Sequence, residues 1–168
     1  MYPFSVKGGA ECAQLTINGL GEKTGNGDIA ETAIAAKLYG MDVEIDMKKL
    51  YKAAKLVEKL TNIPISPLKP VVGENVFKRE TGVAVAQVIT YPPAVEGYSP
   101  EILGREREIL LSKKSGKSSV EYKLGQFNIK ATEAQVEEVL KAVKELGVKK
   151  KGNVSDDEFK DIAAKIIK

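Results

Sequence analysis

The sequence predicts an α/β chain that is mostly helical, and three observations support this fold class. A short strand-like segment near the amino terminus runs into a glycine-rich loop and a helix. Six of the seven prolines fall within residues 63–116, which interrupts regular structure there. Apolar residues then recur at helical spacing from residue 117 onward. We therefore expect three parts, at residues 1–62, 63–116 and 117–168.

The first part contains one predicted strand and two predicted helices. Residues 10–17 alternate as a short strand does, and the loop 18–27 follows. Asp28, with Glu31 three residues later, is typical of a helix start, and this helix is expected to end at Gly40. A second helix is predicted from Asp46 to about Asn62, with a stripe of apolar residues on one face.

The middle and last parts differ in regularity. Residues 63–116 are expected to form a linker or a small irregular subdomain, with one short helix near Ser99. Helices are predicted near 117–124, from Thr132 to about Gly147, and from Ser155 onward. The single predicted strand has no sheet to join, so it pairs with another chain or belongs to a longer α/β domain.

Composition excludes several classes of function. The chain has no histidine, so histidine triads and histidine-ligated metal chemistry within it are excluded. Its one cysteine cannot form an internal disulfide, which favours a cytoplasmic location. No apolar run approaches the roughly 18 residues of a membrane span. The formal net charge of +3 comes with no basic face, so we expect neither nucleic-acid nor membrane binding.

The loop after the predicted strand gathers residues suited to a ligand site. Its glycines let the backbone approach a ligand closely. Four polar side chains stand at this strand end, where β/α barrels place their chemistry: Thr16, Asn18, Glu22 and Asn26. A simple glycine turn is the alternative interpretation.

Five stretches in order resemble the isopropylmalate synthase and homocitrate synthase family, which is similar to hydroxymethylglutaryl-CoA lyase and belongs with it to a metal-dependent barrel superfamily. They are TINGLGEKTGN at 16–26, KPVVGENVF at 69–77, ETGV at 80–83, SPEILG at 99–104 and KSGK at 114–117. The resemblance implies that residues 1–62 form the last β/α unit of a TIM-type barrel. A linker subdomain and a small helical subdomain would follow.

The resemblance implies an acyltransferase that condenses acetyl-CoA, or a similar acyl-CoA, with a 2-oxo acid. In the family a divalent metal (Mg, Mn or Zn) polarises the ketone. By match, Asn26 would be a metal ligand. The substrate pocket would be lined by Thr16, Asn18, Glu22, Gly25 and Arg79, and the catalytic candidates are Glu80, Tyr91 and Tyr98.

The sequence departs from the family in extent and in chemistry. The other metal ligands, an Asp and a His-x-His pair, are absent, so the missing barrel half must come from the same longer polypeptide or from a separate subunit. Arg79 and Ala84 stand where the family has histidines, and arginine cannot act as a base. Arg79 is instead suited to bind a carboxylate or a CoA phosphate.

Three functions therefore remain open: part of a condensing synthase, a non-catalytic acyl-CoA-binding or regulatory module, and a related acyl-CoA lyase. Relatives pair their linkers across a homodimer, so a homodimer is expected. A basic run contacts CoA phosphates or is simply solvated: Arg105, Arg107, Lys113, Lys114 and Lys117.

Overall fold

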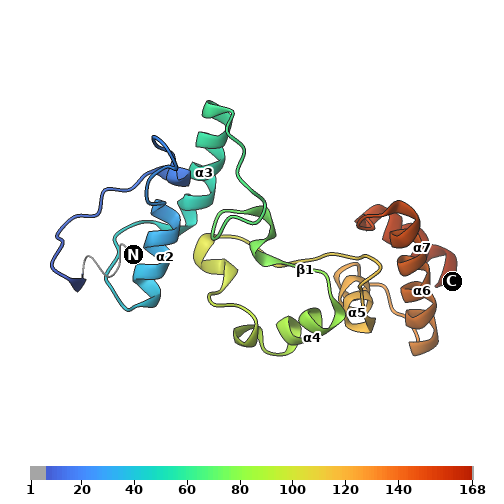
Figure 1. Ribbon diagram of the computed structural model, residues 1–168. Helices are drawn as coiled ribbons and strands as arrows, with labels where there is room; N and C mark the ends of the chain where they lie inside the picture. Colours follow the sequence, from blue (N-terminus) through green and yellow to red (C-terminus); the bar gives the residue numbers. More distant parts are fainter. Residues whose placement is uncertain (1–6, 168) are drawn as a thin grey trace. The chain divides into compact units, whose positions relative to one another are not determined.

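The computed structural model describes residues 7–167, which form two compact units. Unit 1 holds residues 7–77 and 100–106, and unit 2 holds residues 78–99 and 107–167. The described chain is mostly helical, as the sequence predicts, and it contains one small two-stranded sheet (Figure 1). Among the described residues, no helix has the length and apolar character needed to cross a membrane.

Unit 1 is built on two helices that pack side by side, α2 (Ile29–Leu38) and α3 (Met47–Thr61) (Figure 1). Both begin at the predicted aspartates. Asp28 accepts hydrogen bonds from the backbone N–H groups of Ala30 and Glu31, and Asp46 accepts one from Lys48. Such caps satisfy amide groups that have no partner within the helix, which is why local sequence predicts these starts.

The predicted strand at residues 10–17 is not formed. Residues 10–15 have no regular structure, and only Thr16 makes an isolated bridge, to Asp28. The loop then continues as a short 3-10 helix, η1 (Ile17–Gly19). A strand is stable only when neighbours pair with its backbone, and the described chain supplies none here.

Arg105 makes several contacts with the 69–77 segment of unit 1. Arg105 follows η4 (Pro100–Leu103) and donates hydrogen bonds to the carbonyl oxygens of Val71, Gly73 and Glu74, the last of these at the start of η2 (Glu74–Phe77). Its guanidinium also lies 4.4 Å from the ring centre of Tyr51 and 5.3 Å from that of Phe77. These hydrogen bonds and cation–π contacts link the 69–77 segment to α3.

Unit 2 contains a helix and two strands that the sequence did not predict. Helix α4 (Gly82–Thr90) is followed by η3 (Pro92–Ala94), and strands β1 (Lys78–Arg79) and β2 (Glu108–Ile109) pair in parallel. The helix was missed because it is rich in valine and Thr81 makes no side-chain cap. Two-residue strands are too short to produce a pattern.

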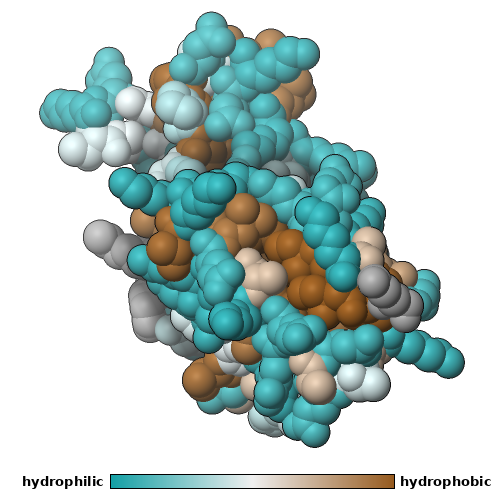
Figure 2. All heavy atoms as spheres, turned by 90° about the vertical axis from the view of Figure 1, so that its right-hand side faces the viewer, coloured by the Kyte–Doolittle hydropathy of each residue, from teal (hydrophilic) through white to brown (hydrophobic). Residues whose placement is uncertain are grey.

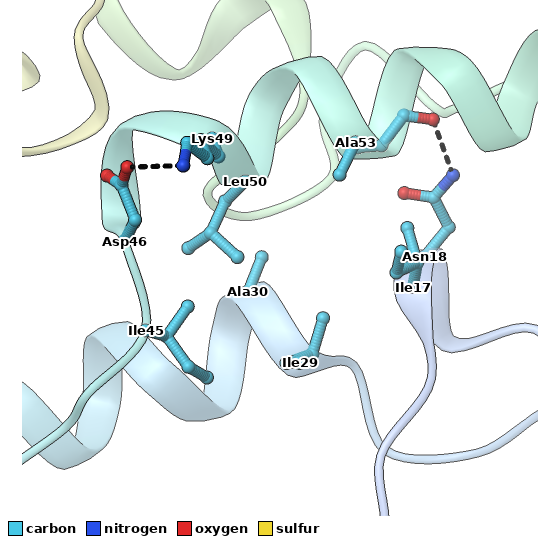
Figure 3. A pocket seen from close by; sticks show the side chains of 10 residues that line it. Ile17, Asn18, Ile29, Ala30, Ile45, Asp46, Lys49, Leu50 and Ala53 are labelled. Atoms are coloured by element: carbon cyan, nitrogen blue, oxygen red, sulfur yellow. Dashed lines mark hydrogen bonds and ion pairs between the residues drawn. The ribbon is translucent and has the colours of Figure 1, made fainter.

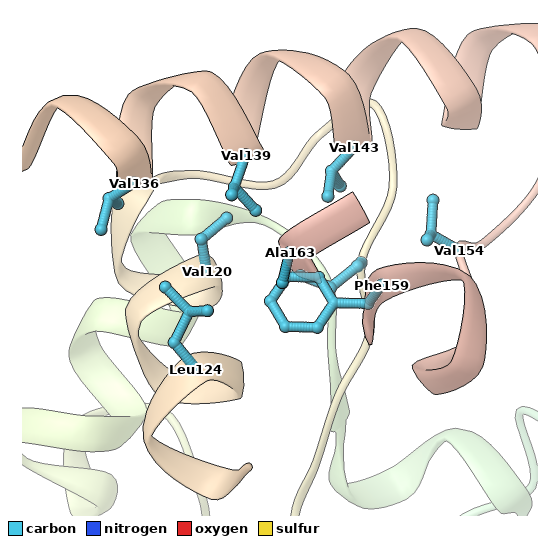
Figure 4. Close-up of a cluster of buried hydrophobic side chains, with 9 residues drawn as sticks. Val120, Leu124, Val136, Val139, Val143, Val154, Phe159 and Ala163 are labelled. Carbon is cyan, nitrogen blue, oxygen red and sulfur yellow. The ribbon is translucent and has the colours of Figure 1, made fainter. Parts of the chain in front are cut away.

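The core of unit 2 lies between α5 (Lys117–Gln126), α6 (Glu133–Lys150) and α7 (Asp156–Ile166) (Figure 4). Phe159 is fully buried and faces Val139, Val143 and Leu124. α6 and α7 start at the predicted residues, and each start is a capping box, formed by Thr132 with Gln135 and by Ser155 with Glu158. The sequence therefore predicted these helix starts correctly.

The predicted end of α6 at Gly147 is wrong, because the helix continues to Lys150. Gly147 is buried against the segment 112–113, and a Cβ at this position would lie 2.7 Å from the backbone nitrogen of Lys113. The glycine serves close packing between two segments and does not end the helix.

Replacing Gly147 by alanine is expected to destabilise the protein by about 1–3 kcal/mol, because the added methyl overlaps backbone atoms. The matched control is Gly125→Ala in α5, where a Cβ would meet nothing within 4 Å. That change is expected to stabilise by up to about 1 kcal/mol through helix propensity. Urea unfolding followed by circular dichroism measures both, and equal effects of the two changes would contradict the close packing at Gly147.

Candidate functional site

The loop at residues 16–28 is closed by its own backbone. The amide of Thr16 donates to the carbonyl of Gly27 at 2.9 Å, and the carbonyl of Thr16 accepts from Ile29 at 3.0 Å. Halfway along, the amide of Asn26 donates to the carbonyl of Gly19 at 2.8 Å. Gly25 has φ 94°, and a Cβ there would lie 2.3 Å from the Gly19 oxygen. The loop conformation therefore requires glycine at residue 25.

Two of the predicted site residues point at one atom. Thr16 Oγ1 and Asn26 Nδ2 both donate to the carbonyl oxygen of Leu20, at 2.8 and 3.0 Å. Within the described part of the chain, Asn26 Oδ1 has no hydrogen-bond partner, and the residue is exposed. The amide is thus oriented with its donor group occupied and its oxygen available to a ligand.

Asn18 and Glu22, the other two polar side chains of the loop, do not contact the Leu20 carbonyl as Thr16 and Asn26 do. Asn18 Nδ2 donates to the carbonyl of Ala54 at 3.0 Å, which ties the loop to α3 (Figure 3). It borders a mostly apolar pocket of about 240 Å³, which is lined by isoleucine, leucine and alanine side chains together with Asp46 and Lys49. Glu22 is exposed on the loop. In this structure, therefore, Asn18 joins two elements of unit 1.

A polar pocket of about 470 Å³ adjoins the loop, between Asn26 and the start of α2. Lys69 enters it and pairs with Asp28 Oδ2 at 3.2 Å and with Glu31 at 3.1 Å. Partial burial lowers the pKa of Lys69, but its hydrogen bonds with Glu31 and Asp28 outweigh this, and the net pKa is raised. Lys69 thus links the 69–77 segment to the cap of α2.

Arg79 makes backbone contacts in this structure. Its guanidinium donates from Nη1 to the carbonyl of Lys78 at 2.9 Å and from Nη2 to that of Val95 at 3.3 Å. It lies at the β1–β2 pairing, half-buried. These bonds hold the turn after α4 against β1.

Glu80 is the centre of a small polar cluster. Its carboxylate accepts a hydrogen bond from Ser112 Oγ at 2.5 Å and pairs with Lys114 Nζ at 3.1 Å. The Ser112 bond, opposed by partial burial and aided by Lys114, holds the pKa of Glu80 below its usual value. At neutral pH the carboxylate is therefore ionised.

Because this pKa is lower in the folded chain than in the unfolded one, Glu80 stabilises the fold above the unfolded value of about 4.3. That contribution is lost as the pH falls through the folded value. We expect Glu80→Gln to reduce stability by roughly 1 kcal/mol at pH 7 and by less at pH 3. Urea midpoints at both pH values test this, with exposed Glu121→Gln as control; the same loss at both would contradict it.

The two candidate tyrosines lie near each other in sequence but differ in setting. Tyr91 ends α4 and is 64% exposed. Tyr98 is half-buried and lines a pocket of about 410 Å³ with the ion pair of Glu96 and Arg107. Arg107 binds Glu96 through both Nε and Nη2, at 2.8–3.0 Å. Sequence reasoning missed this pair, since nothing local indicates which carboxylate Arg107 meets.

The described residues fit one position of a metal site. Asn26 offers one amide oxygen, a ligand type that suits hard divalent cations. Among residues 7–167 there is no group of three or more His, Cys, Asp or Glu placed to hold a metal ion. Further ligands would have to come from outside the described residues.

Two family models match consecutive parts of this chain. The HMGL-like family model matches residues 4–57, and the model named homocitrate synthase post-HMGL domain-like matches residues 71–151. A relative in Archaeoglobus fulgidus, named provisionally as an (R)-citramalate synthase, is 41% identical over 165 residues, which is 98% of this chain and 34% of the relative.

Two further relatives carry related names. The (R)-citramalate synthase of Methanocaldococcus jannaschii is 38% identical over 144 residues, 85% of this chain and 29% of the relative. Homocitrate synthase AksA of Methanopyrus kandleri is 35% identical over 164 residues, 97% of this chain and 41% of the relative. The chain thus spans about a third of the length of the curated relatives it matches.

The two family models fall in sequence order on the segments where the loop at 16–28 and the Glu80 cluster lie, and the relatives align with almost the whole chain. The chain therefore belongs to the HMGL-like family, alongside the citramalate, isopropylmalate and homocitrate synthases.

Proposed function

We propose that this chain is the carboxy-terminal part of a synthase that condenses an acyl-CoA with a 2-oxo acid. The observation that supports this most is the orientation of Asn26. Its amide nitrogen is bound to the Leu20 carbonyl, and its oxygen has no hydrogen-bond partner in the described chain. In this proposal the oxygen is one ligand of a divalent metal, Mg, Mn or Zn, which supplies Lewis-acid polarisation of the 2-oxo acid.

Each neighbouring residue has a proposed role around that oxygen. Thr16 and Gly25 hold the loop that presents Asn26. Glu22 is exposed on the same loop, and substrate contact is its proposed role. Lys69 pairs with Asp28 and so holds the end of the loop at the start of α2.

The missing barrel half is proposed as the partner of unit 1. Unit 1 leaves large apolar side chains exposed, several of them on or just after α3: Leu56, Leu60, Ile63 and Leu68. Exposed apolar area of this kind marks surfaces that another segment covers. Figure 2 shows the side of Figure 1 that carries α6 and α7, and hydrophobic areas between hydrophilic side chains are visible on that face too. The barrel half would belong to the same polypeptide or to a separate subunit.

A homodimer through the linker is proposed for unit 2. Helix α4 exposes Val83 and Ile89, and Tyr91 follows directly. Its opposite face, with Val85 and Val88, packs into unit 2. An apolar stripe on both faces of one helix favours a second contact surface.

The base of the reaction is proposed to be a group other than histidine. Arg79 cannot accept the proton and is engaged with two backbone carbonyls. Glu80 is ionised at neutral pH and could accept a proton, and Tyr91 and Tyr98 are the other candidates. Each requires an acyl-CoA within hydrogen-bond reach.

The test is thiol release from acetyl-CoA by the assembly isolated from its native cells, with a panel of 2-oxo acids and a divalent metal. Release that depends on the 2-oxo acid, with a condensed product seen by mass spectrometry, is the expected result. Mass spectrometry of the purified assembly should also find a His-x-His segment. If the assembly shows no thiol release and contains no His-x-His segment, the proposal is refuted.

A second candidate, binding of acyl-CoA without turnover, is favoured by Arg79 and Ala84, which stand where the family has histidines and cannot act as bases. The same assay separates the two. Acyl-CoA that binds the purified assembly without any thiol release would support the binding module.

A further inference from the structure

A pocket of about 640 Å³ in unit 2 borders Glu80, one of the catalytic candidates, but its other lining residues have no role in the reaction proposed above. It lies between the segment 112–114 and the end of α6 with the loop that follows it, and its volume falls in the range of small-ligand sites. Three lysines and one carboxylate line it: Lys113, Lys114, Lys151 and Glu80. The lining thus carries an excess of two positive charges.

The walls of this pocket are fixed by backbone contacts. The amide of Val154 donates to the carbonyl of Leu111 at 2.7 Å, which joins the two segments. Gly152 donates to Gly147 at 3.3 Å, and Lys151 adopts a left-handed conformation with φ 54°. Gly147 lies against the backbone of residues 112–113. Lys113 and Lys151 therefore come from two segments that are held together.

Some basic residues of this region form ion pairs or hydrogen bonds within the chain, and others do not. Lys114 pairs with Glu80, Lys117 with Glu133 and Glu137, and Lys150 with Glu158. Arg105 and Arg107 are bound within their own units. In the described part of the chain, the side chains of Lys113, Lys151 and Asn153 make no hydrogen bond or ion pair, and all three line the pocket.

The negative end of the α6 dipole, equal to about half a charge, lies nearby and offsets only part of the positive excess. Two ammonium groups and an amide around one pocket match the oxygens of phosphate groups. We propose that this pocket binds a small molecule that carries a diphosphate or phosphate ester, held by Lys113, Lys151 and Asn153. The proposal holds whether or not the chain takes part in condensation.

Isothermal titration of the full chain with inorganic pyrophosphate and, separately, with CoA tests the proposal at low salt. Lys113→Gln and Lys151→Gln are each expected to weaken binding roughly ten-fold, the loss of one charge-assisted hydrogen bond. Exposed Lys52→Gln on α3 makes the same charge change elsewhere and should leave binding unaltered. Circular dichroism establishes that each variant is folded.

The two probes distinguish the sources of the phosphate. Tighter binding of CoA than of pyrophosphate, lost in both variants, supports the site and assigns it to the nucleotide end of an acyl-CoA. Equal binding supports the site and assigns it to free phosphate compounds. Absence of binding at millimolar concentration, or equal weakening by Lys52→Gln, would overturn the proposal without affecting the condensation assay.

Discussion

Phe159→Ala is expected to lower the free energy of unfolding by about 3–5 kcal/mol. The ring has no exposed surface and packs against valines of α6 and Leu124 of α5 (Figure 4). Its removal leaves a cavity bounded by three helices, which cannot collapse without unpacking them.

Urea unfolding followed by circular dichroism measures this effect. Val148→Ala is the control, because Val148 is 60% exposed on the same helix bundle and its truncation should cost less than about 0.5 kcal/mol. If Phe159→Ala cost no more than the control, the core described for unit 2 would be wrong.

Lys69→Met is expected to lower the stability of unit 1 by about 2–3 kcal/mol. The side chain of Asp28 is 4% exposed, so removing its cation leaves a buried carboxylate without its ion pair. Breaking a fully buried pair costs about 3–5 kcal/mol, and the 21% exposure of the Lys69 side chain reduces that.

Lys69→Arg is the matched variant, since it keeps the charge and should retain most of the stability. Hydrogen exchange of the Ala30 and Glu31 amides, which Asp28 caps, reports the site directly. Unchanged protection of these amides in Lys69→Met would show that the ion pair does not position the cap.

Helix starts could be predicted from the sequence because they depend on neighbours in the chain. Asp28, Asp46, Thr132 and Ser155 each cap the helix that their sequence context indicates. The end of α6 could not be predicted, because Gly147 serves a contact with residues 112–113 that no local pattern reveals. The prediction of a strand at 10–17 was wrong for a related reason, because a strand forms only when another segment pairs with its backbone.

In the candidate site, too, local features could be predicted from the sequence and contacts between distant residues could not. The loop at 16–26 was found from its own residues and from the family resemblance. The ion pairs of Lys69 and the hydrogen bond from Ser112 to Glu80 join distant parts of the sequence, and many lysines and carboxylates were equally possible partners. The roles of Glu80, Tyr91 and Tyr98 in catalysis and of Arg79 in substrate binding stay predictions.

The most direct measurement is the metal affinity of the assembly from native cells, compared between wild type, Asn26→Ala and Asn26→Asp. We predict that Asn26→Ala weakens divalent-metal binding roughly ten-fold or more, and that Asn26→Asp, which restores an oxygen ligand, recovers most of it. Thiol release from acetyl-CoA should fall and recover in parallel. Metal affinity and thiol release that are both unchanged in Asn26→Ala would contradict the proposal that this chain completes the metal site of a condensing synthase.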